Sequence, residues 1–419
     1  MDAAGSEEIP ALSWEFNGTM KILMLHNFYQ QRGGEGVSFA VEAEALRQRG
    51  HQVDTFTLDN AVDLPKLGKV GIAVNAVWSK SSFKKVKAKL QKNSYDLMHV
   101  QNFFPLLSPS VYDAAGECGV PVIQALRNYR LFCMEAGLLL NGNLCEKCIK
   151  AGSSLPGLKN RCYRDSMSAS LSHSIMLEFH RLKRTWWKKV DAYIAVSDFV
   201  KGKYVEAGWS SESVFVKHNS VLPEREVGSG EGNFFVTAGR LSEDKGLDVI
   251  VQAWQELRKT IHASEMPVLK IIGDGPLHEY LRSIIENNKL ESCIKLTGRL
   301  SLSDTYKQMG EARAIILPSV RHEPCSRTIA ESYAKGTPVI ASSIGGNTEL
   351  VEHEISGYQV LSGNVDELVN RVRSVMTLPE SEYNQLRRAS RLKFDREFAP
   401  DVNAQRLEKI YKTVCEHGV

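Results

Sequence analysis

The sequence predicts an α/β protein made of two doubly wound parallel-sheet domains that face each other across a cleft. Three observations predict it. A strand, a glycine-rich loop, a helix and a second strand follow one another over residues 21–58, which is how a doubly wound sheet begins. The same kind of series starts again at residue 234. The chain has 419 residues, enough for two or three domains with hydrophobic cores of their own.

In the first half, residues 21–25 form a short apolar run, and the loop Gly33-Gly34-Glu35-Gly36 leads into a helix over residues 37–49. Alternation over residues 52–58 predicts a strand, and apolar runs predict further strands at 97–101, 120–125 and 192–196. Residues 1–19 fit no element of this unit, so we interpret them as an extension or an expression scar before Met20. The first domain is then expected over residues 20–220.

In the second half, apolar runs separated by helical patterns predict strands at 234–238, 268–272, 294–297, 314–317 and 339–341. The second domain is expected over residues 221–395, with the join near residue 220. Residues 396–419 are expected to form a helix that packs back on the first domain. Such sheets bind ligands beyond the C-terminal ends of their strands, so the shared cleft is the expected site.

Composition excludes several other classes. Hydrophobic residues make up 43% and charged residues 24%, which is typical of a soluble globular protein. No apolar run is long enough to span a membrane, and the acidic N-terminal residues do not form a secretory signal, so we expect a cytosolic protein. The net charge of +3 is too small to indicate nucleic-acid binding. Residues 1–220 contain 27 Lys and Arg against 21 Asp and Glu, which suits a phosphorylated acceptor or a membrane surface, or is a chance distribution.

The stretch from Ser319 to Glu331 is the most informative one for chemistry. It follows the strand at 314–317 and leads into a helix, with Glu323 in the loop and Glu331 about two turns later. Free N–H groups at a helix start can bind an anion or a sugar hydroxyl, and a carboxylate can accept hydrogen bonds from vicinal hydroxyls. The alternative is two solvated glutamates that the helix dipole favours.

Two cations, Arg240 and Lys245, lie on the loop after the strand at 234–238. Two cationic side chains on a loop that leads into a helix can bind a diphosphate. Glycine loops also follow the strands at 268–272 and 339–341.

In this order, these motifs resemble glycosyltransferase family 4, whose members are retaining enzymes with two Rossmann-like domains, the GT-B fold. The resemblance extends from Met20 over nearly the whole chain and is most specific in the second domain. It implies that Glu323 holds a hydroxyl of the transferred sugar and Glu331 binds the ribose of the donor. It also implies that Arg240 and Lys245 neutralise the diphosphate. Further donor contacts are implied for Gly33, Gly34, Arg299, Ser326, Arg327 and Thr328.

The sequence favours a transfer without a catalytic metal. The leaving group is a diphosphate, whose growing charge two cations and helix N-termini can stabilise. No Asp-x-Asp pair, the usual metal anchor of the other glycosyltransferase fold, is present in the sequence.

The first domain departs from the family pattern at two positions. Family members often carry a histidine after the strand at 120–125, where it contacts the donor sugar, and this sequence has Arg127 there. Gln101 stands where a second histidine is common. A contact to donor or acceptor can be expected of Arg127, but a histidine role cannot.

Four of the eight cysteines, Cys133, Cys145, Cys148 and Cys162, cluster after Asn128-Tyr129-Arg130. They resemble a cysteine-rich insertion found in a subset of the family. Four thiolates, two of them in a Cys-x2-Cys knuckle, could form a closed structural zinc site, which a loop with little apolar content could use as a staple. Reduced thiols without a metal, or redox chemistry, are the alternatives.

Two basic stretches suggest contact with a membrane surface. Residues 80–92 place lysines around an apolar helical face, and residues 180–189 place Trp186 and Trp187 among cations. Aromatic and basic residues together suit a lipid interface. The alternative is a pair of solvated helices whose aromatic residues face the core.

We therefore predict a retaining, metal-independent glycosyltransferase that moves a hexose from a nucleotide diphosphate sugar to a glycan or glycolipid acceptor, in polysaccharide or lipopolysaccharide biosynthesis. Two alternatives stay open. One is an enzyme of the same fold, such as a sugar-nucleotide epimerase or a phosphorylase, although no motif marks the pyridoxal phosphate lysine of a phosphorylase. The other is a non-catalytic protein that binds sugar nucleotides or a protein partner.

Overall fold

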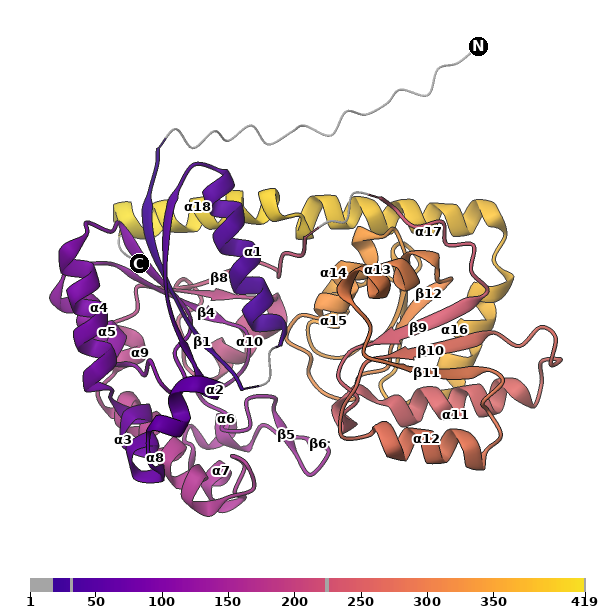
Figure 1. The fold of residues 1–419 in the computed structure, drawn as a ribbon, viewed down its shortest axis with the longest axis horizontal. Helices are drawn as coiled ribbons and strands as arrows, with labels where there is room; N and C mark the ends of the chain where they lie inside the picture. Colours follow the sequence, from indigo (N-terminus) through magenta and orange to yellow (C-terminus); the bar gives the residue numbers. More distant parts are fainter. Residues whose placement is uncertain (1–17, 31–32, 223–225, 418–419) are drawn as a thin grey trace, which may run out of the picture.

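A computed structural model of the chain describes residues 18–30, 33–222 and 226–417. Within these residues, two parallel six-stranded sheets form two domains that stand side by side (Figure 1). This confirms the predicted class, two doubly wound α/β domains facing each other. Residues 1–17 of the predicted 1–19 extension lie outside the described residues.

The first sheet has its strands in the order β2 (Gln52–Asp59), β1 (Lys21–Phe28), β3 (Leu97–Asn102), β4 (Val122–Leu126), β7 (Ala192–Ala195) and β8 (Val214–Val216). All neighbours pair in parallel. β3 and β4 are buried along their whole length, as expected for strands covered on both faces. The strand order reverses between β1 and β3, so a crevice opens at the C-terminal ends of these two strands.

The second sheet has its strands in the order β11 (Ile294–Gly298), β10 (Val268–Ile272), β9 (Phe234–Ala238), β12 (Ala314–Leu317), β13 (Val339–Ser342) and β14 (Gly357–Val360). Its order reverses between β9 and β12. The loop that carries Lys245 follows β9, and the loop that carries Glu323 follows β12. The topology therefore brings the two predicted loops to the same edge of the sheet.

Two edge strands, β8 and β14, were not among the predicted strands. β8 contains only three residues, and Gly357 and Gln359 interrupt the apolar pattern of β14.

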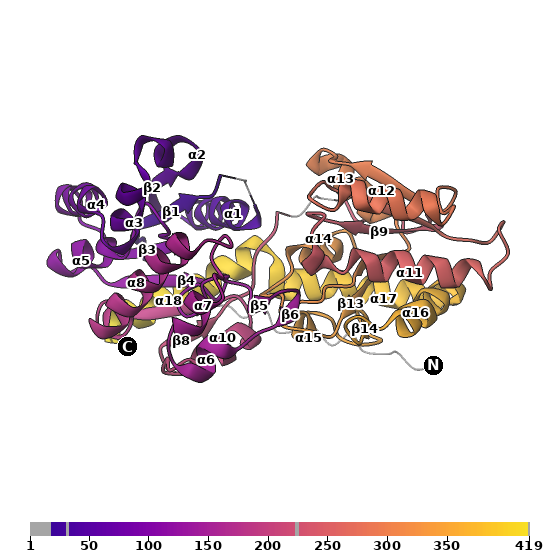
Figure 2. The same ribbon diagram turned by 90° about the horizontal axis from the view of Figure 1, so that it is seen from below.

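Helices cover both faces of the first sheet (Figure 2). One face packs against α1 (Gly34–Gln48) and α18 (Pro400–His417). The other packs against α4, α5 and α9. The helices that follow α1 in this domain are α2 (Asn60–Asp63), the 3₁₀ turn η1 (Leu64–Lys66), α3 (Lys69–Val77), α4 (Lys80–Lys92), α5 (Ser110–Glu117) and α10 (Asp198–Glu206).

The chain between β4 and β7 forms an insertion on the first domain. It contains the two-stranded hairpin β5 (Leu139–Leu140) and β6 (Asn143–Leu144). Its helices are α6 (Lys147–Ala151), α7 (Leu155–Lys159), α8 (Met167–Leu182) and α9 (Thr185–Lys188).

In the second domain, α11, α12 and α16 cover one face of the sheet, and α13, α14 and η3 cover the other. The elements of this domain are the 3₁₀ turn η2 (Glu243–Lys245), α11 (Leu247–Arg258), α12 (His278–Asn287), α13 (Leu302–Glu311), α14 (Arg327–Ala334), α15 (Asn347–Leu350), α16 (Val365–Thr377), α17 (Glu380–Lys393) and the π-helical turn η3 (Phe394–Phe398).

The last helix returns to the first domain. α17 continues through η3 into α18, which crosses the top of Figure 1 and lies along α1. Arg49 makes ion pairs of 2.6 Å with both Asp401 and Glu408, and His51 Nε2 lies 2.9 Å from Glu408. Apolar residues of α18 complete the core on this face of the first sheet. Among the described residues, no helix combines the length and the apolar character needed to cross a membrane.

Candidate active site

The site lies in the cleft between the domains, at the C-terminal ends of the central strands. Three adjoining cavities, of about 630, 380 and 970 Å³, are all lined by Gly34 from the first domain and Arg240 from the second. They form one continuous cleft. A cleft of this size, polar and shared by both domains, can hold a nucleotide sugar together with an acceptor.

Glu323 is the most strongly paired carboxylate in the cleft. Its side chain is 8% exposed, accepts a hydrogen bond from Lys245 Nζ and lies 3.3 Å from Ser319 Oγ. Arg321 Nε is 3.6 Å away. Burial opposes ionisation, but the charges of Lys245 and Arg321 outweigh it and lower the pKa of Glu323 to about 2. The carboxylate therefore stays ionised at neutral pH.

The backbone fixes Glu323 in this position. Its carbonyl oxygen accepts a hydrogen bond of 2.7 Å from Gly346 N. Gly345 has a φ of +63°, and a Cβ there would lie 2.6 Å from both N and O of Glu323. Glycine therefore allows the loop after β13 to approach the Glu323 loop.

A second cluster joins the two domains at the start of α14. Arg327 Nη2 lies 3.2 Å from Glu331 Oε1, and Arg327 Nη1 donates to Ser38 Oγ of α1 at 2.8 Å. Burial raises the pKa of Glu331, and the charge of Arg327 opposes this effect. A Cβ on Gly34 would lie 2.7 Å from Arg327 Cδ, so glycine lets the first domain come close to this side chain.

The structure places every predicted donor and catalytic residue on the wall of the cleft. Arg240, Lys245, Ser326 and Thr328 line it together with Glu323 and Glu331. Gly33 lines two of the three cavities. Arg299 lies further along, in the largest cavity, opposite the glycine loop after β10. The residues thus divide into one group around Lys245 and Glu323 and one around Arg327 and Glu331, with Arg299 at the far end.

Arg127 lines the cleft from the first domain and belongs to a buried polar network. Its Nη2 donates to Glu42 Oε1 at 2.7 Å and to Gln101 Oε1 at 2.8 Å, and its Nη1 donates to Asn219. Lys217 also pairs with Glu42. Burial opposes the ionisation of Glu42, but Arg127 and Lys217 hold its pKa well below the usual range.

The same network explains the two departures from the family pattern. Gln101 Nε2 donates to Glu42 Oε2 at 2.7 Å. His99 lies in the same network, and burial lowers its pKa to about 3, so it is neutral at physiological pH. Arg127 is thus held by partners inside the first domain. Asn219 continues the chain of contacts to the second domain, because its Nδ2 donates to the carbonyl of Cys325 at 3.2 Å.

Sequence reasoning missed several cleft residues. Arg321 bridges Asp244 at 3.1 Å and Glu323; it stands two positions before Glu323, so its place beside the predicted carboxylate could have been inferred. Tyr29, Glu35 and Arg130 line the wall of the first domain. Their proximity depends on how loops after different strands meet, which the sequence pattern does not reveal.

The structure does not support the predicted zinc site. Cys133, Cys145, Cys148 and Cys162 do line one small cavity of about 10 Å³. However, the described part of the chain contains no group of three or more His, Cys, Asp or Glu arranged to hold a metal ion. Burial raises the pKa of Cys133 to about 12 and that of Cys148 to about 11.

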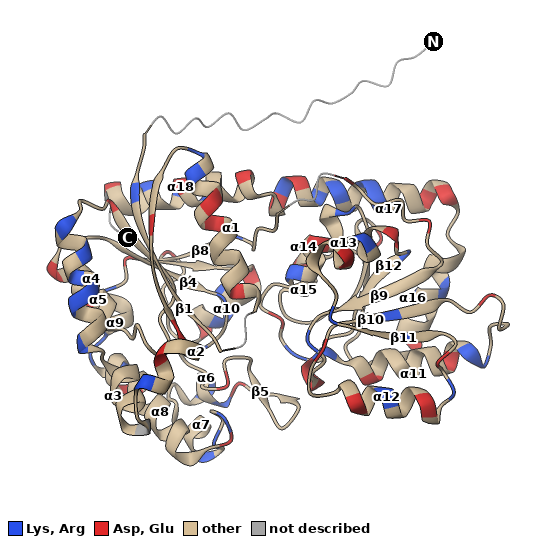
Figure 3. Cartoon of the chain, viewed as in Figure 1, with Lys and Arg blue, Asp and Glu red and all other residues tan. Residues whose placement is uncertain are grey.

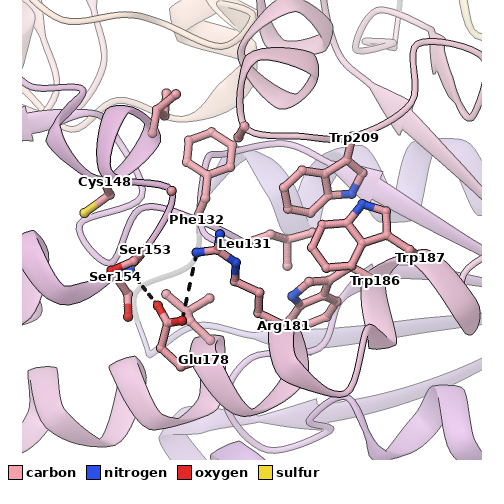
Figure 4. Close-up of a pocket in the computed structure, with 14 residues that line it drawn as sticks. Leu131, Phe132, Cys148, Ser153, Ser154, Glu178, Arg181, Trp186, Trp187 and Trp209 are labelled. Atoms are coloured by element: carbon pink, nitrogen blue, oxygen red, sulfur yellow. Dashed lines mark hydrogen bonds and ion pairs between the residues drawn. The ribbon is translucent and has the colours of Figure 1, made fainter.

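The predicted membrane role of the two tryptophans is wrong for Trp186. This side chain is 1% exposed and stacks on Phe103 in the core. Trp187 packs against the same core, and its Nε1 donates to Gly208 O at 3.1 Å. Figure 4 shows both side chains beside Trp209 at the wall of a small cavity. The aromatic rings thus belong to the interior.

The helix predicted over residues 80–92 forms as α4, and its apolar side does not form a lipid-binding face. Val86 and Leu90 are buried in the core. Its Lys80, Lys84, Lys85 and Lys92 are exposed, and the helix is marked by blue segments at the left of Figure 3. The core interpretation therefore holds for this helix.

Two facing doubly wound domains, with paired cations and carboxylates in the cleft between them, define the class of the GT-B glycosyltransferases. Comparison with known proteins identifies the family. The sequence model described as "Glycosyl transferases group 1" matches residues 223–393, and the model described as "Glycosyl transferase 4-like domain" matches residues 33–220. The chain belongs to the group 1 glycosyl transferases, with a glycosyl transferase 4-like first domain.

Relatives agree with this assignment. An uncharacterized glycosyltransferase of Methanocaldococcus jannaschii is 24% identical over 376 residues, which cover 85% of this chain and 89% of that protein. The amylovoran biosynthesis glycosyltransferase AmsK of Erwinia amylovora is 25% identical over 258 residues, which cover 59% of this chain and 62% of AmsK. The crystal structure of HepE of Anabaena in complex with UDP has a TM-score of 0.66 at 18% identity and covers 94% of this chain and 100% of HepE.

Proposed function

We propose that the protein is a retaining, metal-independent hexosyltransferase that uses a nucleotide diphosphate sugar and extends a glycan or a lipid-linked glycan in polysaccharide or lipopolysaccharide biosynthesis. The ion pair of Lys245 with Glu323, on the wall of the cleft lined by Arg240, carries this proposal. In this pair, Lys245 is the cation that would bind a phosphate, and Glu323 is the adjacent carboxylate that would bind a sugar hydroxyl.

In the proposed reaction, the bond between C1 of the sugar and the diphosphate oxygen breaks, and the diphosphate keeps the electron pair. The acceptor hydroxyl forms the new bond at C1 on the same face of the sugar. Its proton passes to the leaving diphosphate. Arg240 and Lys245 stabilise the growing negative charge, a contribution that preorganised charges can make in a closed cleft.

The two carboxylates take different parts of the donor. Glu323 is held ionised by Lys245 and Arg321, so it can accept a hydrogen bond from a hydroxyl of the sugar. Glu331 lies at the other cluster, next to Arg327, and binds the ribose. The backbone near Arg299, which lines the cavity at the far end of the cleft, binds the base.

The first domain supplies the acceptor side. Arg127, Asn128 and Arg130 line the cleft opposite the donor loops. Because two of these are cationic, they suit an acceptor with an anionic group, such as a diphosphate-linked lipid. An enzyme that uses such a lipid-linked acceptor would work at the inner face of a membrane.

The proposal is tested by turnover. The enzyme is incubated with UDP-glucose first, because HepE has also been crystallised with UDP-glucose, and then with other nucleotide sugars. We expect release of the nucleoside diphosphate that increases when an acceptor is supplied, persists in EDTA, and gives a product with the anomeric configuration of the donor.

The alternatives predict other results. An epimerase changes the sugar without any acceptor, and a non-catalytic protein binds a nucleotide sugar without releasing the diphosphate. Strict dependence on added Mg²⁺ or Mn²⁺ would contradict the metal-independent mechanism, and inversion at C1 would contradict retention.

A further inference from the structure

Helix α8 exposes an apolar stripe to solvent. The side chains that form it are between 40% and 84% exposed, namely Met167, Leu171, Ile175, Phe179 and Leu182. Their spacing of three or four residues places them on one side of the helix. The opposite side of α8 is buried, with Met176 and Leu177 in the core of the first domain. The stripe is therefore additional to the face that holds the helix in place.

Helix α3, which packs beside α8, also exposes apolar side chains. The two helices pack side by side at the lower left of Figure 1, and His180 Nε2 lies 2.7 Å from the carbonyl oxygen of Val77 where both helices end. On α3, Val70 and Val74 are 78% and 63% exposed, one helical turn apart. Both helices are mostly tan in Figure 3, because few charged residues interrupt this surface. Exposed apolar side chains gathered on two helices that pack together are typical of an interaction site.

Basic residues surround the stripe. From residue 159 to residue 189 the chain contains eight Lys and Arg but only two acidic residues, Asp165 and Glu178. Lys183, Arg184 and Lys188 follow the stripe and are exposed. Lys183 Nζ lies 5.9 Å from the ring centre of Phe179. Glu178, by contrast, is paired: it accepts from Ser154 N at 2.6 Å and lies 4.0 Å from Arg181 (Figure 4).

We infer that the α3–α8 face, defined as Val70, Val74 and the five-residue stripe of α8, docks on the surface of an anionic lipid bilayer. Apolar side chains can enter the boundary between headgroups and acyl chains while the lysines and arginines contact the anionic headgroups. A second copy of the chain is a poorer occupant, because pairing two such faces would bring two basic rims together.

The docking surface connects to the cleft through the insertion. α8 belongs to the insertion between β4 and β7, and residues 135–137 of the same insertion line the cleft. An enzyme held by α8 would thus present the cleft wall of its first domain near the bilayer. The inference itself does not depend on catalysis, because lipid binding can be measured without a donor.

The test is co-sedimentation of the full-length protein with vesicles of phosphatidylglycerol and phosphatidylcholine, and with vesicles of phosphatidylcholine alone. We expect binding to the anionic vesicles that weakens with added salt. Leu171→Ser/Ile175→Ser should lower the partition coefficient about tenfold, because apolar area no longer enters the interface. Lys183→Glu/Lys188→Glu should lower it about tenfold or more.

Matched controls come from the second domain. Leu302→Ser/Leu361→Ser changes two leucines that are 61% and 62% exposed, and Lys295→Glu/Lys307→Glu reverses two exposed lysines. Neither should change vesicle binding. Circular dichroism and thermal unfolding confirm that each variant is folded.

Three results would overturn the inference. The first is the absence of binding to anionic vesicles, and the second is an equal loss of binding in the second-domain controls. The third is a dimer, seen by sedimentation velocity, that dissociates in Leu171→Ser/Ile175→Ser while vesicle binding is unchanged. Failure of the transferase proposal alone, with no diphosphate release, would leave vesicle binding intact.

Discussion

Lys245 donates a hydrogen bond to Glu323 inside the cleft, although 78 residues separate them in the sequence. Each residue follows one of the two strands at which the order of the second sheet reverses, β9 for Lys245 and β12 for Glu323. A bound diphosphate would compete with Glu323 for the ammonium group. The pair therefore couples the part of the cleft that can take a phosphate to the part that can take a sugar.

Glu323→Gln should lower kcat by about 10²-fold, since one charged contact to the reacting group in a closed cleft is worth about 3 kcal/mol in the transition state. Donor KM should change less. Initial rates against donor concentration measure both constants. Glu279→Gln, an exposed carboxylate on α12, is the control and should behave as wild type. A kcat near the wild-type value in Glu323→Gln would remove Glu323 from the sugar site.

Glu331→Ala should raise donor KM about tenfold or more and lower kcat less than Glu323→Gln does. The contact to the ribose is made equally in the ground state and in the transition state. Its loss therefore weakens the binding of the donor in both states, which raises KM more than it lowers kcat. A hydrogen bond to a charged group is worth about 1.5–3 kcal/mol. Calorimetric titration with the nucleoside diphosphate should give the same loss of affinity. Unchanged affinity would place the ribose elsewhere.

Glu42→Ala should destabilise the fold by about 3–5 kcal/mol, because it leaves Arg127 and Lys217 buried without their shared carboxylate. The free energy of unfolding in urea measures this cost. Glu44→Ala, two residues later on the same helix and 53% exposed, is the matched control and should cost about 0.5 kcal/mol or less. Similar losses for the two variants would mean that the buried network does not hold the domain together.

His173 should make the protein sensitive to acid. Both ring nitrogens are buried without a hydrogen-bond partner within the described residues. Burial, together with the charge of Arg130, lowers the pKa of His173 well below 6.5. Below pH 6.5 the unfolded chain therefore takes up a proton that the folded chain does not. The free energy of unfolding consequently decreases as the pH is lowered below 6.5.

The corresponding variant is His173→Phe. Between pH 6 and pH 5, wild type should lose about 1 kcal/mol more stability than this variant. The ring of residue 173 already stacks on Phe104 with centroids 4.7 Å apart, which a phenyl ring can retain. His262→Asn, at an exposed position, should leave the pH slope of wild type unchanged. Equal slopes in wild type and His173→Phe would show that His173 is protonated in the native state.

The fold and the position of the donor loops could both be predicted from the sequence, because both follow from the order of strands and loops. In a parallel doubly wound sheet, loops after consecutive strands meet at one edge, so Lys245 and Glu323 could be placed together without coordinates. The contact of Arg327 with Ser38 could not be predicted, because it depends on how closely the two domains approach. The sequence shows that Arg127 departs from the family pattern, but it does not show that Glu42, from a helix far away in the chain, pairs with it.

Two predictions that the structure does not support, the membrane role of Trp186 and the zinc site of the clustered cysteines, rest on residue type and spacing alone. The burial of Trp186 and Cys133 depends on how the insertion folds against the core. The exposed stripe of α8 could not be predicted, because its residues alternate with buried ones and a helix that is apolar on two sides resembles a core helix in sequence.

The position of α18 has a consequence for how the protein is made. Ala404, Leu407, Tyr411 and other residues of α18 complete the hydrophobic core beside α1 and β1, yet they are translated about two hundred residues after the first domain's last strand. At about 5–20 residues per second, the nascent first domain waits roughly 10 to 40 seconds for its missing helix. Its apolar surface beside α1 stays exposed during that interval, and transiently exposed apolar surface is prone to aggregation. Final assembly of this domain can therefore follow only after α18 has been synthesised.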